Sequence, residues 1–146
     1  MSLPNLGDPA GEAGEEGEPV TVDVLIAEDE PSILKSLDFI LRRAGWTIES
    51  ATDGDAALSA VRRNRPRVLV LDVMLPKRSG FDVLKQIRAD ALLSGLPVLI
   101  LTAKGQAQDR RIAEDLGADG FVTKPYANAE VVDAVRALMQ RSGAGA

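Results

Sequence analysis

Residues 68–76, VLVLDVMLP, hold the strongest indication of the fold class. Four aliphatic residues in a row predict a strand that is buried on both faces, which is typical of a parallel sheet covered by helices on each side. Asp72 ends this run, and burying a lone carboxylate is costly unless it is paired or coordinated. The stretch therefore predicts a parallel sheet, and it places at the strand end a carboxylate that is either a turn residue or part of a site.

Strand-like and helix-like segments alternate along the chain on both sides of this stretch. Strands are predicted at 20–27, 46–51, 68–72, 96–102 and 120–123. Helices are predicted at 31–45, 53–66, 81–89, 106–116 and 127–141, with Ser79 as the cap of the third. Five such units predict an α/β fold, (βα)5, with a five-stranded parallel sheet and helices on both faces. If the sheet is doubly wound, the first strand lies beside the third.

The net charge of −5 is unevenly distributed. Residues 1–19 contain five acids and neither lysine nor arginine, whereas the remaining acids and bases cancel. The first 19 residues are also rich in glycine and proline, so they are predicted to be a disordered acidic leader whose opening residues could include a cloning remnant. The organisation expected after it is one folded domain at 20–141 and a short tail at 142–146.

Several classes of function are disfavoured by composition. The chain has no cysteine and no histidine, which excludes disulfides, thiolate metal sites, cysteine nucleophiles and a phosphohistidine of its own. There is neither a membrane span nor a signal sequence, which predicts a cytoplasmic protein without membrane contact. A neutral domain also argues against nucleic-acid binding, and its arginine cluster is interpreted as a solvated helix end: Arg62, Arg63, Arg65 and Arg67.

Polar side chains occupy the ends of four predicted strands: Glu28, Asp29, Asp72, Thr102 and Lys124. The carboxyl ends of parallel strands share one edge of a sheet, so these groups are expected to converge there. Three carboxylates in one place require a cation, and oxygen ligands suit Mg²⁺. With a hydroxyl and an ammonium beside the metal, these residues predict phosphoryl transfer with Asp72 as the nucleophile. The acids after the first strand, Glu28 and Asp29, could also cap the first helix.

Four motifs, in this order, resemble the CheY-like receiver domain of two-component response regulators: LIAEDEPS at 25–32, VLVLDVMLPKRSGFDVL at 68–84, LTAK at 101–104 and GADGFVTKPY at 117–126. The resemblance covers about 20–141 and implies a doubly wound sheet with the flavodoxin-like order 2-1-3-4-5. It implies that Asp72 is the phospho-acceptor and that Thr102 and Lys124 contact the phosphoryl group. For the metal, Mg²⁺, it implies the ligands Asp29, Asp72 and the Met74 backbone carbonyl, with Glu28 acting through water.

The same resemblance implies a conformational switch. Phe121 occupies the position of the aromatic switch residue, whose ring turns inward when Thr102 is drawn to the phosphoryl group. Ala103 is small and leaves room for that group. The peptide between Lys124 and Pro125 is expected to be cis. The implied protein is a signalling switch, not an enzyme, that catalyses only its own phosphorylation and slow dephosphorylation.

The resemblance also implies partners. The donor is expected to be the phosphohistidine of a histidine kinase or of a histidine phosphotransfer protein. Phosphorylation is expected to change the surface of the fourth helix, fifth strand and fifth helix. A downstream protein target, or a second copy of the chain in a homodimer, would bind that surface. The sequence leaves open whether the receiver stands alone or belongs to a longer protein.

Three other functions have less support in the sequence. A phosphatase or phosphotransferase of the haloacid dehalogenase type would want an acid two residues after the nucleophile, where Met74 stands. A receiver-like scaffold that is never phosphorylated would usually have lost an acid or the lysine, and all are present. A flavin or cobalamin module lacks support because there is no histidine and no phosphate-binding loop after the first strand.

Overall fold

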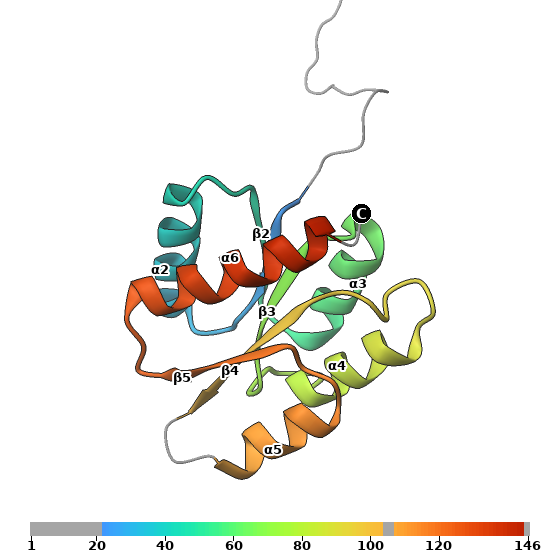
Figure 1. The fold of residues 1–146 in the computed structure, drawn as a ribbon. Helices are drawn as coiled ribbons and strands as arrows, with labels where there is room; N and C mark the ends of the chain where they lie inside the picture. The colour runs from blue at the N-terminus through green and yellow to red at the C-terminus, as the bar shows by residue number, and fades with distance from the viewer. Residues whose placement is uncertain (1–21, 104–106, 145–146) are drawn as a thin grey trace, which may run out of the picture.

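The computed structural model describes residues 22–103 and 107–144 (Figure 1). Its five strands form one parallel sheet in the order β2-β1-β3-β4-β5, which confirms the predicted topology. The strands are β1 (Val24–Ala27), β2 (Ile48–Ala51), β3 (Val68–Asp72), β4 (Val98–Ala103) and β5 (Gly120–Lys124). The helices are α2 (Pro31–Arg43), α3 (Gly54–Asn64), α4 (Gly80–Ala89), α5 (Ala107–Asp115) and α6 (Asn128–Ala144).

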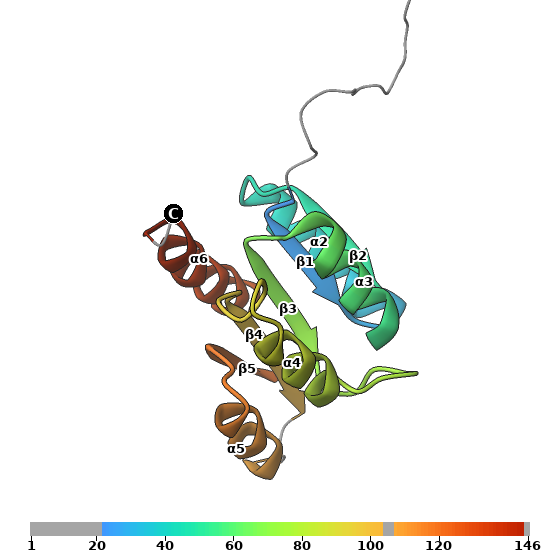
Figure 2. The same ribbon diagram turned by 90° about the vertical axis from the view of Figure 1, so that its right-hand side faces the viewer.

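Helices cover both faces of the sheet, as predicted. Helices α2 and α6 lie on one face and α3, α4 and α5 on the other (Figures 1 and 2). Successive residues of a strand point to opposite faces, so β3 contributes Leu69 and Leu71 to one core and Val68 and Val70 to the other. Every residue of β3 is buried, which explains the uninterrupted aliphatic run.

Several element boundaries differ from the predictions. The strand expected at 20–27 begins at Val24, because the residue before it, Asp23, exchanges hydrogen bonds with Thr47 in place of a regular ladder. The second strand begins at Ile48 and not at 46. The last helix continues to Ala144, past the predicted end at 141. The leader predicted at 1–19 and residues 20 and 21 of the predicted first strand lie outside the described residues.

Arg88 at the end of α4 forms a hydrogen-bonded cluster that the strand and helix patterns did not predict. Its guanidinium donates to the carboxylate of Asp119 at 2.8 Å, and Asp119 also accepts from the backbone N–H of Val98 at 2.8 Å. The same guanidinium donates to three backbone carbonyls: Ser94, Leu96 and Gly117. Arg88 therefore joins α4 to the segments that precede β4 and β5.

An Arg88→Ala variant is expected to be less stable by about 2–3 kcal/mol, because the partly buried Leu96 carbonyl loses its donor and Asp119 loses one of its cationic partners. Urea unfolding followed by circular dichroism measures the change. The matched control is Lys85→Ala on the exposed side of the same helix, which is expected to change the stability by less than about 0.5 kcal/mol. Equal losses in the two variants would contradict a specific role for Arg88.

Candidate functional site

The carboxyl ends of β1, β3 and β5 bring the predicted acids and lysine together. Glu28 and Asp29 follow β1 directly, Asp72 is the last residue of β3, and Lys124 is the last residue of β5. Carboxylate oxygens of Glu28, Asp29 and Asp72 lie within 4.8 Å of one another. The convergence expected from a parallel sheet is therefore present.

Lys124 lies between two buried carboxylates. Its Nζ donates to Oε1 of Glu28 at 3.2 Å and to Oδ2 of Asp72 at 3.0 Å. Glu28 is 1% exposed and Asp72 is 4% exposed, whereas the lysine side chain is 25% exposed. The buried Asp72 is thus paired with a cation, which explains how a carboxylate is tolerated at the end of a buried strand.

Burial and neighbouring charges change the pKa of two groups in this cluster, Glu28 and Lys124. Burial, followed by a side-chain hydrogen bond with Asp72, raises the pKa of Glu28 to about 7. Burial by itself would lower the pKa of Lys124, but the hydrogen bond and the negative charge of Asp72 outweigh it and raise that pKa. Lys124 therefore stays cationic at neutral pH, while the proton of Glu28 is readily lost to a competing cation.

The donor set fits a hard divalent cation. Three carboxylates face one ammonium, so negative charge is in excess, and all the available ligand atoms are oxygens. Asp29 is exposed, so a cation held here would keep access to water, as Mg²⁺ requires. Burial of Glu28 would cost less with a cation present, because the charge of the ion favours the ionised carboxylate.

The alternative role for these acids, capping the first helix, belongs to a different residue. Glu30 is the N-cap of α2, and its side chain accepts from the backbone N–H of Ser32 at 2.8 Å. Hydrogen bonds from the Ser32 side chain and backbone lower the pKa of Glu30. Glu28 accepts from the backbone N–H of Glu30 through Oε2 at 3.1 Å, but its Oε1 accepts from Lys124, so helix capping does not account for it.

The remaining predicted residues surround this cluster. The backbone N–H of Met74 donates to Oδ1 of Asp72 at 3.0 Å, while the Met74 side chain is 73% exposed. Thr102 is buried on β4, and its hydroxyl lies 3.4 Å from that of Thr123 on β5. Phe121 is partly buried on β5 beneath the guanidinium of Arg110. The peptide between Lys124 and Pro125 is cis, which confirms that prediction.

Gly80 allows α4 to begin directly against the end of β3. A Cβ atom at this position would collide with the carbonyl oxygen of Asp72 and lie 2.8 Å from the Cα of Val73. Because both atoms belong to the backbone, no rotamer change can relieve the clash. A side chain at Gly80 would therefore displace the strand end that carries Asp72.

A Gly80→Ala variant is expected to lose about 2 kcal/mol or more of stability, measured by urea unfolding. The control is Gly95→Ala, where a Cβ would meet nothing within 4 Å, and its stability is expected to stay within about 0.5 kcal/mol of the wild type. A Gly80→Ala protein as stable as the Gly95→Ala protein would show that this junction can move freely.

Comparison with known proteins agrees with this geometry. A model of the response regulator receiver domain matches residues 24–136. The chain belongs to this family. This membership confirms the resemblance read from the four motifs and the assignment to two-component signalling, in which receiver domains are signalling modules.

Two curated relatives illustrate the similarity of this receiver domain to full regulators. TcrX of Mycobacterium tuberculosis, described as a probable transcriptional regulatory protein, is 48% identical over 88% of the chain and 53% of its own length. PhoP of Bacillus subtilis, an alkaline phosphatase synthesis transcriptional regulatory protein, is 41% identical over 82% of the chain and 49% of its own length. The chain thus spans about half the length of these relatives.

Solved receiver domains have the same fold. The receiver domain of the Francisella response regulator 1452 superposes with a TM-score of 0.77 at 29% identity, covering 84% of this chain and 99% of that one. The receiver domain of the sensor histidine kinase PA1611 from Pseudomonas aeruginosa superposes with a TM-score of 0.76 at 25% identity, covering 83% and 99%. The latter was solved with a magnesium ion coordinated in its active-site cleft.

Proposed function

We propose that this receiver domain accepts a phosphoryl group on Asp72 in a Mg²⁺-dependent reaction. The observation that carries the proposal is the meeting of Asp72 with Glu28, Asp29 and Lys124 at one edge of the sheet. In the proposed step an oxygen of the Asp72 carboxylate attacks phosphorus and forms a P–O bond. The P–N bond of the donor phosphohistidine breaks, and its electron pair stays on the imidazole nitrogen.

Each neighbouring group has a proposed part in this step. Asp29, Asp72 and the Met74 carbonyl are proposed to hold Mg²⁺, with Glu28 acting through water. When bound, Mg²⁺ would neutralise charge on the oxygens of the transferring phosphoryl group. Lys124 would move from its pairing with the two carboxylates toward a phosphoryl oxygen, and the Thr102 hydroxyl would donate to another. Water attack on the product would return Asp72 slowly to the free acid.

The proposed consequence is a change of surface and not turnover of an external substrate. Thr102, drawn to the phosphoryl group, would leave Thr123 and make room for Phe121 to turn inward. The surface affected would be that of the fourth helix, fifth strand and fifth helix, here α5, β5 and α6. A downstream protein or a second copy of the chain would recognise it. The proposed donors are a histidine kinase or a histidine phosphotransfer protein, and the proposed compartment is the cytoplasm.

Membrane and nucleic-acid contact do not enter this proposal. Within 22–103 and 107–144, no helix is both long and apolar enough to cross a membrane. One relative, MtrA of Mycolicibacterium smegmatis, is described as a DNA-binding response regulator, and this chain covers 51% of its length. We propose that the domain described here does not itself bind DNA, since its arginine cluster is largely paired with acids.

Intact mass spectrometry after incubation with acetyl phosphate tests the proposal. The expected result is a gain of one phosphoryl group that requires Mg²⁺, is lost in hydroxylamine as an acyl phosphate is, and maps to the peptide containing Asp72. Acetyl phosphate replaces the unidentified donor, and a histidine kinase preparation provides a second donor. No gain from either donor in the presence of Mg²⁺ would favour a receiver-like scaffold that is never phosphorylated.

A further inference from the structure

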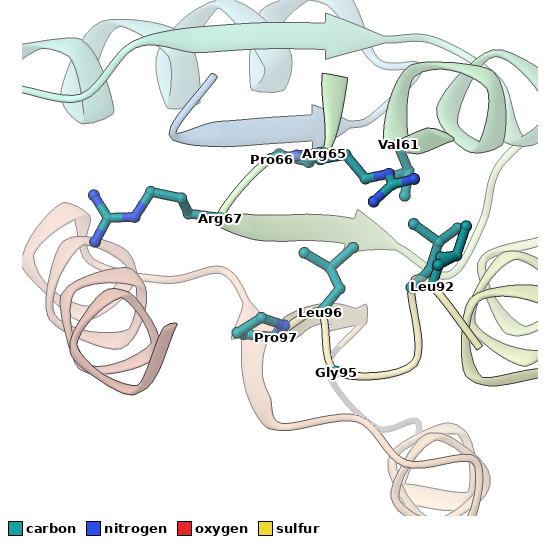
Figure 3. Close-up of a pocket in the computed structure, with 9 residues that line it drawn as sticks. Val61, Arg65, Pro66, Arg67, Leu92, Gly95, Leu96 and Pro97 are labelled. Carbon is teal, nitrogen blue, oxygen red and sulfur yellow. The ribbon is translucent and has the colours of Figure 1, made fainter. Parts of the chain in front are cut away.

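A pocket lies at the amino ends of β3 and β4, at the opposite end of these strands from the acidic cluster (Figure 3). It has a volume of about 260 Å³. Its walls include the aliphatic side chains of Val61, Leu92 and Leu96 together with Arg65. Leu92 is 72% exposed, which makes it one of the few large apolar side chains on the described surface. The pocket therefore offers an apolar wall with a cation at its edge.

Arg65 is the unpaired member of the arginine cluster. Arg62, Arg63 and Arg67 each have a carboxylate partner, whereas no ion pair or side-chain hydrogen bond is found for Arg65 among the residues that the structure describes. Figure 3 shows its side chain extending toward Val61 and Leu92, while Arg67 extends the other way. The pocket thus contains a cation without a counter-charge.

The backbone of Arg65 is also in an unusual conformation for its residue type. Arg65 ends α3 with a φ of 48°, in the left-handed region where glycine or asparagine is the ordinary choice. A side chain with a Cβ costs about 1 kcal/mol in this conformation. Glycine would serve the helix end better, so the arginine side chain is expected to contribute something other than local stability.

The acidic segment 8–18 of the same chain has the complementary charge. It contains five acids and no base: Asp8, Glu12, Glu15, Glu16 and Glu18. The described chain begins at Val22, and the carbonyl of the next residue, Asp23, accepts from the backbone N–H of Arg67 at 3.1 Å. Arg67 lines the pocket, so the segment is joined to the fold beside it. Glu18 is four residues from Val22, a reach of up to about 14 Å.

We propose that segment 8–18 docks in cis on this pocket, which we call the Arg65 pocket. A carboxylate of the segment pairs with the Arg65 guanidinium, and the segment covers the exposed Leu92. The short tether gives the contact a high effective concentration, so it can form although a single exposed ion pair is weak. The inference is independent of phosphorylation at Asp72, and it assigns to Arg65 a role that the sequence pattern interpreted as a solvated helix end.

Paramagnetic relaxation tests this contact in the full chain. The protein has no cysteine, so an Ala13→Cys variant carries a single nitroxide label within the segment. The expected result is selective broadening of the backbone amides of Arg65, Gly95 and Leu96 in the ¹⁵N-labelled protein. Reduction of the nitroxide provides the reference intensities. Broadening spread evenly over the surface, or confined to another site, would overturn the proposal.

Two variants in the labelled background identify the charges. Arg65→Gly removes the cation and places the favoured residue at the left-handed position, so the fold is expected to persist while the broadening at Gly95 and Leu96 is lost. The control is Arg111→Gln, an exposed arginine on α5 for which no ion pair is found within 22–103 and 107–144, and it is expected to leave the broadening unchanged. Broadening that survives Arg65→Gly would overturn the pairing.

Two further conditions separate this contact from other occupants. In 1 M NaCl, where the screening length is about 3 Å, the broadening is expected to fall toward the reference intensities. A mixture of nitroxide-labelled ¹⁴N chain with unlabelled ¹⁵N chain is expected to show no broadening. Broadening in that mixture would mean that the pocket binds the segment of a second copy, and broadening insensitive to salt would exclude the charge-based docking.

Discussion

An Asp72→Asn variant is expected to gain no phosphoryl group from acetyl phosphate, with or without Mg²⁺, and to unfold at a higher urea concentration than the wild type in Mg²⁺-free buffer. The first effect follows because an amide oxygen is too weak a nucleophile to replace the carboxylate. The second follows because Glu28 then pairs with Lys124 without repulsion from a carboxylate at position 72. We expect the gain in stability to be roughly 1–2 kcal/mol.

Asp82→Asn is the matched control for this variant. Asp82 is an exposed carboxylate in the first turn of α4, and its change to asparagine is expected to leave both the phosphoryl gain and the unfolding midpoint close to wild type. A phosphoryl gain retained by Asp72→Asn would refute Asp72 as the acceptor. A loss of stability in that variant would mean that the attraction between Asp72 and Lys124 outweighs the repulsion between the two carboxylates.

The stability of the Mg²⁺-free protein is expected to contain a contribution from Glu28 that falls as the pH rises from about 4.5 to about 7. In this interval the folded chain keeps the Glu28 proton, because burial raises the pKa from 4.5 to about 7, whereas the unfolded chain loses it. The folded state then binds more protons than the unfolded state, so the free energy of unfolding decreases with pH. A pKa shift of this size corresponds to a decrease of about 3 kcal/mol in the free energy of unfolding.

Comparison with Glu28→Gln isolates this contribution. The variant and the wild type are expected to have similar urea midpoints near pH 4.5, where Glu28 is uncharged, and the variant is expected to be the more stable at pH 8. Glu30→Gln provides a control of opposite sign. The pKa of Glu30 is lowered, so its stabilisation is present at neutral pH and is lost as the pH falls through the folded pKa. A wild-type curve parallel to that of Glu28→Gln would show that Glu28 ionises normally.

Much of the fold could be predicted because it depends on local periodicity and on one rule of parallel sheets. The aliphatic run at 68–71 and the alternation of strand and helix patterns required a sheet buried on both faces. Since carboxyl ends of parallel strands share an edge, residues separated by as many as 96 positions, such as Glu28 and Lys124, were expected to meet. The boundary errors at the first two strands arose where hydrogen bonds between Asp23 and Thr47 replace the regular ladder.

Energetic details of the site depended on distances that no sequence pattern contains. The sequence placed acids after β1, but only the folded backbone showed that Glu30 caps α2 while Glu28 turns toward Lys124 and Asp72. The raised pKa of Glu28 results from its burial and from a neighbouring carboxyl group far away in the chain.

The sequence by itself determined the α/β class and the set of residues at the acidic edge, because both are encoded in periodicity and in position relative to a strand end. The strand order was predicted through the family resemblance. The tertiary structure determined which carboxylates share Lys124, which acid caps α2, how Arg88 joins three segments, and where Arg65 lies without a partner. These properties arise from side chains brought together across the sheet. Their energies depend on separation and burial, which exist only once the chain has folded.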